Sequence, residues 1–133
     1  MVTQFNQMLR STILLLLGLA AAAQAAVIHG LVVEKLTGYS VANAAVTLQP
    51  IPLAGQTSTT VRGNDSGRFE FGSLTSGAYL VRASRRGFMP AEYGQKRWNS
   101  AGTAIVIDGD TTISIRIPLS RFGSITGTVR DSN

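Results

Sequence analysis

The most restrictive feature of this sequence is a period of two in its apolar residues. In "TTISIRIPL" the isoleucines Ile113, Ile115 and Ile117 alternate with polar residues. Successive side chains of a β-strand point to opposite faces, so this segment predicts a strand with one buried face. The same alternation in 68–71 and 78–84 predicts two more strands of this kind.

Turn-forming residues separate the strand-like segments. Glycine, asparagine and aspartate gather at 63–67 and 108–110, and no stretch has the 3.6-residue period of an amphipathic helix. Short strands with frequent turns predict an all-β fold, a seven-stranded Greek-key sandwich. The predicted strands are 27–34, 44–49, 58–62, 68–71, 78–84, 103–107 and 111–119.

The N-terminal segment differs in composition from the rest. Residues 13–23 are apolar or small, and Ala23-Gln24-Ala25 fits an A-x-A cleavage site. We therefore expect a secretory signal peptide over 1–25, cut after Ala25, and a folded domain over 26–120. The alternative is a membrane anchor, which needs about 20 apolar residues. Export would place the protein in the periplasm, at the outer membrane or outside the cell. Because the chain has no cysteine, such a domain must be stabilised by its core alone.

Gly67, Phe69, Gly77 and Tyr79, near the middle of the chain, are expected to have structural roles, and Phe69 is expected to be buried. Gly67 ends the turn before Phe69 and can adopt a positive φ without steric cost. Leu74, Gly77 and Tyr79 have the spacing L-x-x-G-x-Y, which is typical of a tyrosine corner. In that motif the ring is buried and the hydroxyl bonds to nearby backbone.

Several segments together resemble a known family. "IHGLVV", Thr37-Gly38, "AAVTL" and "NDSGRFEFGSLTSGAYLVRASRRGF" are similar to the pattern of the carboxypeptidase regulatory-like domain over about 27–119. Asn64 stands where that pattern has an aspartate, and 41–43 replaces its usual proline and glycine. The resemblance implies a transthyretin-like or prealbumin-like β-sandwich, also grouped with carbohydrate-binding-like folds. It further implies an accessory module, found behind zinc carboxypeptidase domains, before TonB-dependent receptors and in tandem surface arrays.

The residues themselves favour no catalytic or metal site. A catalytic zinc needs about three protein ligands, and the chain offers one histidine, His29, and no cysteine. A G-x-S-x-G nucleophile elbow is missing from the sequence. The net charge of +5 is spread along the chain without a nucleic-acid-binding motif. We expect no enzyme activity, no cofactor, no metal and no nucleic-acid partner.

One long irregular segment, 85–103, is the candidate binding region. It combines aromatic rings with hydrogen-bond donors, the groups that bind sugars. The alternative is that Phe88 and Trp98 cap an open end of the sandwich. Polysaccharide or another envelope protein would be the partner. The candidate ligand-binding residues are Tyr93, Trp98, Phe88, Arg97 and Asn99.

The end of the sequence repeats its beginning. Residues 124–131 match 27–34, with Ile125 placed 97 positions after Ile28. We expect 121–133 to be a linker and the first strand of a truncated second copy, so that further domains of the same polypeptide follow. The alternative is that the tail is a leftover strand that pairs elsewhere. The sequence predicts a non-catalytic exported module for interaction or spacing in a larger envelope or surface protein. The alternatives are a carbohydrate-binding module and the leading appendage of an outer-membrane TonB-dependent receptor.

Overall fold

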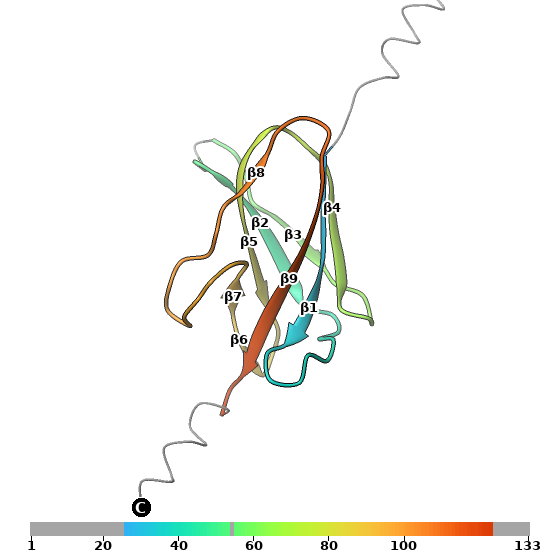
Figure 1. Cartoon of the computed structure of the whole chain (residues 1–133), viewed down its shortest axis with the longest axis vertical. Helices are drawn as coiled ribbons and strands as arrows, with labels where there is room; N and C mark the ends of the chain where they lie inside the picture. Colours follow the sequence, from blue (N-terminus) through green and yellow to red (C-terminus); the bar gives the residue numbers. More distant parts are fainter. Residues whose placement is uncertain (1–25, 54, 124–133) are drawn as a thin grey trace, which may run out of the picture.

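The computed structural model describes residues 26–53 and 55–123, and this part of the chain forms two β-sheets packed face to face (Figure 1). Within it there are strands and turns but no helix, and so no helix able to cross a membrane. The predicted signal peptide and the predicted second-copy strand lie outside the described residues. The strands are β1 (Ala26–Glu34), β2 (Ala45–Ile51), β3 (Thr59–Arg62), β4 (Arg68–Leu74), β5 (Gly77–Ser84), β6 (Phe88–Met89), β7 (Ala91–Glu92), β8 (Ile105–Ile107) and β9 (Thr112–Arg121).

The two sheets differ in how their strands run. The first has the order β4-β1-β9-β6, and its two central strands, β1 and β9, are parallel. The second has the order β3-β2-β5. Strands β7 and β8 both pair with the remaining edge of β5, β8 near its start and β7 near its end. Apart from β1 with β9, all strand pairs in the two sheets are antiparallel. Because β1 and β9 run the same way, the described chain enters at one end of the sandwich and leaves at the other (Figure 1).

The core lies between the sheets and follows the alternation of the sequence. In β4 the two phenylalanines, Phe69 and Phe71, are buried and their rings meet edge to face, with centroids 6.0 Å apart. In β9 Ile115 and Ile117 are buried, while Ile113 is half-buried against the core. Burying these side chains removes apolar surface from water, which is the main favourable term in folding. The prediction of an all-β sandwich is confirmed.

The predicted strands correspond to β1, β2, β3, β4, β5, β8 and β9. The described residues hold two more, β6 and β7, each of two residues and both within the segment predicted to be irregular. They form because β6 pairs with the end of β9 and β7 pairs with the end of β5. Strand β9 also runs to Arg121, beyond the predicted end at Leu119.

Hydrogen bonds and backbone conformation shape the turn before β4 and the start of β5. The Asn64 Oδ1 atom accepts hydrogen bonds from the backbone N–H of Ser66 and of Arg68, both at 2.9 Å. Gly67 has a φ of 78°. The hydroxyl of buried Tyr79 donates to the backbone carbonyl of Thr75 at 2.7 Å, which is the bond of a tyrosine corner.

Candidate functional site

The loop between β7 and β8 is closed at its base by backbone hydrogen bonds. The N–H of Tyr93 donates to the carbonyl of Val81 in β5, and the N–H of Thr103 donates to the carbonyl of Tyr93, both at 2.8 Å. Two glycines let the outgoing and returning segments of the loop approach each other closely. A Cβ on Gly102 would lie 2.5 Å from the carbonyl oxygen of Tyr93, and Gly94 has a φ of 78°. The loop therefore has a defined base on the edge of the second sheet.

Glu92 organises the part of the loop next to this base. Its Oε1 atom accepts a hydrogen bond from the N–H of Gly102 at 2.7 Å. Its own N–H donates to the Gln95 Oε1 atom at 2.9 Å, and the N–H of Gln95 donates to the Glu92 carbonyl at 3.1 Å. A carboxylate that accepts a backbone N–H ties the returning half of the loop to the outgoing half.

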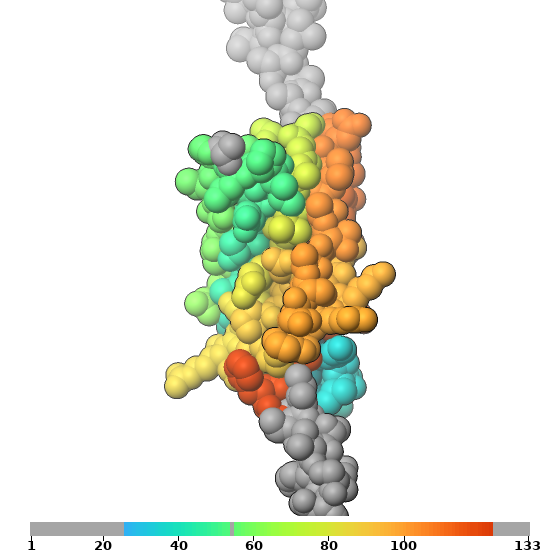
Figure 2. Space-filling view, turned by 90° about the vertical axis from the view of Figure 1, so that its left-hand side faces the viewer, coloured from blue at the N-terminus to red at the C-terminus, as the bar shows by residue number. Residues whose placement is uncertain are grey.

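The tip of the loop is a tight turn that displays a tryptophan. The N–H of Arg97 donates to the Ser100 hydroxyl at 3.0 Å, and the N–H of Ser100 donates to the carbonyl of Arg97 at 3.1 Å. Trp98 lies inside this turn and is 70% exposed. In Figure 2 the orange segment around 94–104 projects from the lower half of the face shown. The fold thus presents an indole ring to solvent on a hydrogen-bonded turn.

A recess of about 90 Å³ lies beside this tip, where the edges of the two sheets meet. It is bounded by the end of β9, the short strands β6 and β7, and the loop tip. Three cationic donors, Lys35, Lys96 and Arg97, line it together with the carboxylate of Glu92. An exposed indole beside cationic and amide donors can stack on a flat apolar surface and bond to the oxygens at its edge. The lining residues are Lys35, Met89, Pro90, Ala91, Glu92, Gln95, Lys96, Arg97, Trp98, Pro118 and Ser120.

The structure does not bring all five candidate ligand-binding residues together. Trp98 and Arg97 line the recess. Tyr93 packs against the hydrophobic core. Phe88 also packs against the core and lies in β6, where the Arg121 guanidinium carbon is 4.9 Å from its ring centroid. Asn99 is exposed and lies outside the residues that line the recess. Of the two residues expected to cap the sandwich in the alternative interpretation, Phe88 contacts the core and Trp98 is exposed to solvent.

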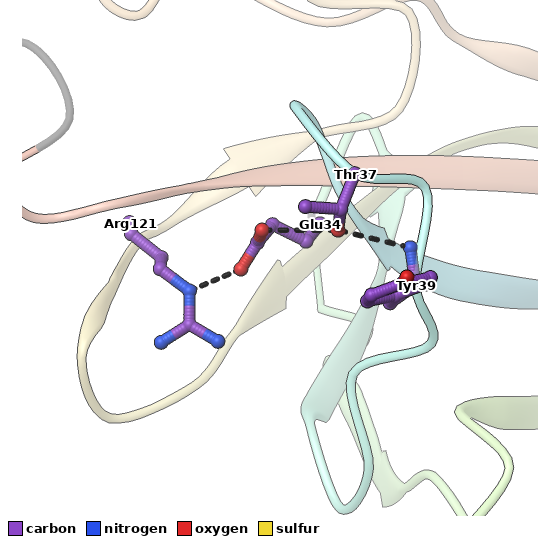
Figure 3. A network of polar contacts seen from close by, with 4 residues as sticks. All are labelled: Glu34, Thr37, Tyr39 and Arg121. Atoms are coloured by element: carbon purple, nitrogen blue, oxygen red, sulfur yellow. Dashed lines mark hydrogen bonds and ion pairs between the residues drawn. The ribbon is translucent and has the colours of Figure 1, made fainter.

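A second feature of this end of the sandwich is a polar network around Glu34, the last residue of β1 (Figure 3). The Arg121 Nε atom, at the end of β9, donates to the Glu34 Oε2 atom in an ion pair. The Thr37 hydroxyl donates to the Glu34 Oε1 atom at 3.0 Å, and the N–H of Tyr39 donates to the Thr37 hydroxyl oxygen at 3.2 Å. Two hydrogen bonds lower the pKa of Glu34 below its ordinary value of 4.5. The bond from Arg121 has the larger effect and the bond from Thr37 the smaller one.

Sequence reasoning did not find this network. Glu34 and Arg121 are 87 positions apart, and no local pattern connects them. They meet because β1 and β9 are parallel neighbours whose last residues lie at the same end of the sheet. The same pairing places Arg121 over Phe88, since β6 lies on the other side of β9.

Two open grooves adjoin this network and share Arg85 and Phe88. One, of about 490 Å³, extends from there to Tyr39 and Arg121. The other, of about 530 Å³, extends to Arg62, Arg86 and Phe122. This end of the sandwich therefore carries arginines among aromatic rings, a composition typical of protein contact surfaces. Nowhere in 26–53 or 55–123 do three histidine, aspartate or glutamate side chains gather closely enough to hold a metal ion.

Comparison with known proteins agrees with this architecture. The model of the carboxypeptidase regulatory-like domain family matches residues 27–119, which is most of the chain. The chain belongs to this family. The regulatory-like domain family is non-catalytic, and the core residues described above lie almost wholly within the matched range. No curated protein shows significant sequence similarity to the chain.

Solved structures share the fold at low sequence identity. The chain is similar to the Bacillus anthracis TIE protein, with a TM-score of 0.56 and 14% identity over 74% of this chain and 17% of that one. It is similar to the group B streptococcus pilus 2b backbone protein, with a TM-score of 0.53 and 11% identity over 75% of this chain and 42% of that one. It is also similar to 3-chlorocatechol 1,2-dioxygenase from Rhodococcus opacus 1CP, with a TM-score of 0.51 and 10% identity over 75% and 61% of the two chains.

These three similarities concern the fold alone. The match covers less than two thirds of each of the three proteins. A pilus backbone protein and a dioxygenase both share the architecture, so the architecture does not determine the activity. Function has to be argued from the residues and the topology of this regulatory-like domain.

Proposed function

We propose that this regulatory-like domain is a non-catalytic module that spaces and connects parts of a larger exported protein of the cell envelope or surface. The observation that carries the proposal is the parallel pairing of β1 with β9. The first and last strands run in the same direction, so the chain crosses the sandwich from one end to the other (Figure 1). Units joined in this way extend along a line instead of folding back.

The length of this step follows from the strands. Strand β9 has ten residues, and a strand rises about 3.3 Å per residue, so one unit adds roughly 33 Å along the line. The sequence that follows Gly123 repeats the opening strand of the domain, which supports a serial arrangement. The predicted signal peptide supports export. Because the chain has no cysteine, the exported module would be stabilised by its core instead of by disulfides.

Small-angle X-ray scattering tests the spacing. We would compare one copy of residues 26–133 with two copies joined end to end. The largest dimension is expected to grow by at least the length of β9, roughly 33 Å. An increase well below that value would mean that the copies pack side by side, and the proposed spacing role would be wrong.

A second candidate function is carbohydrate binding at the loop tip. The observation that favours it is the exposure of Trp98 on a hydrogen-bonded turn, beside the recess lined by Lys35, Lys96 and Arg97. An exposed indole can stack against the C–H face of a sugar, while the neighbouring cationic side chains can donate hydrogen bonds to its hydroxyl oxygens.

Retention on insoluble polysaccharides, peptidoglycan and chitin among them, tests this candidate. Trp98→Ala is expected to weaken retention by roughly five- to tenfold, because one aromatic contact contributes on the order of 1 kcal/mol. Phe122→Ala is the matched control, since Phe122 is 65% exposed at the same end but lies outside the recess. Tyr93→Ala is unsuitable because Tyr93 packs on the core. Equal retention of wild type and Trp98→Ala would exclude the loop tip as the sugar site.

A further inference from the structure

The first and last strands of the domain, β1 and β9, also form the longest continuous ladder among the described residues. Strands β1 and β9 are in register without a bulge from Val27 opposite Thr112 to Glu34 opposite Leu119. Further backbone bonds extend the ladder at both ends. The N–H of Val27 donates to the carbonyl of Thr111 at 2.9 Å, and the N–H of Lys35 donates to that of Leu119 at 2.8 Å.

We propose that this ladder is a mechanical clamp and that the domain carries tension between its neighbours in the polypeptide. Tension enters at the start of β1 and leaves at the end of β9, at opposite ends of the sandwich (Figure 1). The pull is therefore parallel to the strands and shears β1 against β9. The bonds of a parallel ladder are evenly spaced along the two strands, so a pull along the strands loads them together, whereas a pull across one end loads them one after another. The proposal rests on the end-to-end arrangement proposed above.

Neither strand can slide without disrupting the core. Residues Ile28 and Val32 of β1, and Ile117 of β9, are fully buried between the sheets. A slip by one residue would turn the buried face of a strand toward solvent, because side chains alternate. A slip by two residues would shift every buried side chain by roughly 6.6 Å, about twice the rise per residue.

Contacts on both sides keep the pair in place. Strand β1 is also paired with β4 from Ala26 to Leu31, and β9 is also paired with β6 at Ser120 and Arg121, close to where the chain leaves the sheet. At Gly30 the backbones come so close that an added Cβ would lie 2.5 Å from the Ile115 carbonyl oxygen. A side chain at position 30 would therefore push β1 and β9 apart and weaken the ladder.

The exit of the chain is fastened by side chains. Arg121, the last residue of β9, forms an ion pair with Glu34, the last residue of β1 (Figure 3). The Arg121 guanidinium also lies over the ring of Phe88. A pull on the C-terminal end reaches Arg121 before it reaches the ladder. The ion pair and the ring contact thus transfer part of the load directly to β1 and β6.

Single-molecule force spectroscopy with two attachment geometries tests the clamp. The chain contains no cysteine, so each introduced cysteine gives a thiol at a chosen position for attaching the pulling apparatus. In the first geometry the handles are at the two chain ends and the ladder is sheared. In the second, Leu36→Cys replaces the N-terminal handle. Leu36 is 78% exposed just after β1, so both handles are at one end and β9 is peeled away.

At equal pulling speed we expect the mean unfolding force in shear to be roughly two to four times that in peeling, because the bonds share the load only in shear. Chemical denaturation of both versions, expected to give equal midpoints, is the control for stability. Equal forces, or a lower force in shear, would overturn the clamp.

Fluorescence transfer between dyes on the end handles separates this inference from the spacing proposal. Distant dyes with equal forces would reject the clamp and leave the spacing role intact. Close dyes would reject the end-to-end arrangement itself, and the clamp with it.

Discussion

The hydroxyl of Tyr79 allows a prediction about stability to be worked out in detail. The side chain is 6% exposed, and its hydroxyl donates to the backbone carbonyl of Thr75 at 2.7 Å. Tyr79→Phe removes this one O–H group and leaves the ring in its place. The change therefore isolates the hydrogen bond of the tyrosine corner from the packing of the ring.

The magnitude depends on what happens to the acceptor. A hydrogen bond contributes about 0.5 to 1.5 kcal/mol net, and up to about 3 kcal/mol when its loss leaves a buried group unpaired. Thr75 is exposed, so water can reach its carbonyl once the hydroxyl is gone. We expect a loss of about 1 to 1.5 kcal/mol in the free energy of unfolding. For a domain of this size that corresponds to a melting temperature lower by roughly 4 to 12 °C.

Two control variants make the measurement specific. Tyr39→Phe removes the same group from a side chain that is 76% exposed, and it should leave the urea midpoint unchanged. Thr75→Ala removes a hydroxyl that lies 3.2 Å from the Tyr79 hydroxyl but keeps the backbone carbonyl. We expect it to cost much less than Tyr79→Phe. An unchanged midpoint for Tyr79→Phe, or an equal loss for Thr75→Ala, would refute the assignment of the backbone bond.

Two further predictions concern the turn before β4 and the ion pair at the end of β1. Gly67→Ala should destabilise the domain by at least 1 kcal/mol more than Gly38→Ala: both glycines have a positive φ, but only at Gly67 would a Cβ meet a backbone atom, 2.9 Å away at Val32. Equal losses in thermal denaturation would contradict this. Folding lowers the pKa of Glu34 below 4.5. The ionised carboxylate therefore contributes to the free energy of unfolding above pH 4.5, and this contribution is lost as the pH falls through the folded-state pKa. The difference in urea midpoint between wild type and Glu34→Gln should therefore shrink on acidification, and a constant difference would show that the ion pair does not stabilise the fold.

The fold could be predicted because its core obeys a local rule. Phe69 and Phe71, or Ile115 and Ile117, are buried because their neighbours in sequence face outward. The period of two is sufficient to find such strands and their buried faces. Strands of two residues have no period at all. Accordingly β6 and β7, which exist only through pairing with β9 and β5, could not be found in this way.

The candidate site could be predicted only in part. Tyr93 and Trp98 lie in one loop and have similar chemical character, but their surroundings in the fold differ. The backbone of Tyr93 bonds to Val81, which holds its ring against the core, whereas Trp98 lies in the turn farthest from that base. The bonds that separate them involve a strand more than ten residues away. Composition therefore identified the loop, and only tertiary contacts identified which ring faces solvent.

The parallel pairing of β1 and β9 is the feature that local sequence is least able to reveal and that the functional argument needs most. Alternation shows that both segments are strands, but the direction of a pair depends on the path of the chain between them. Strand β9 inserts beside β1 in the middle of the first sheet, and the last residues of both strands then lie together. One topological choice therefore separates the chain ends, loads the ladder in shear and brings Arg121 to Glu34. An antiparallel β9 in the same place would keep the buried isoleucines but return the chain to its starting end, and it would lose all three properties.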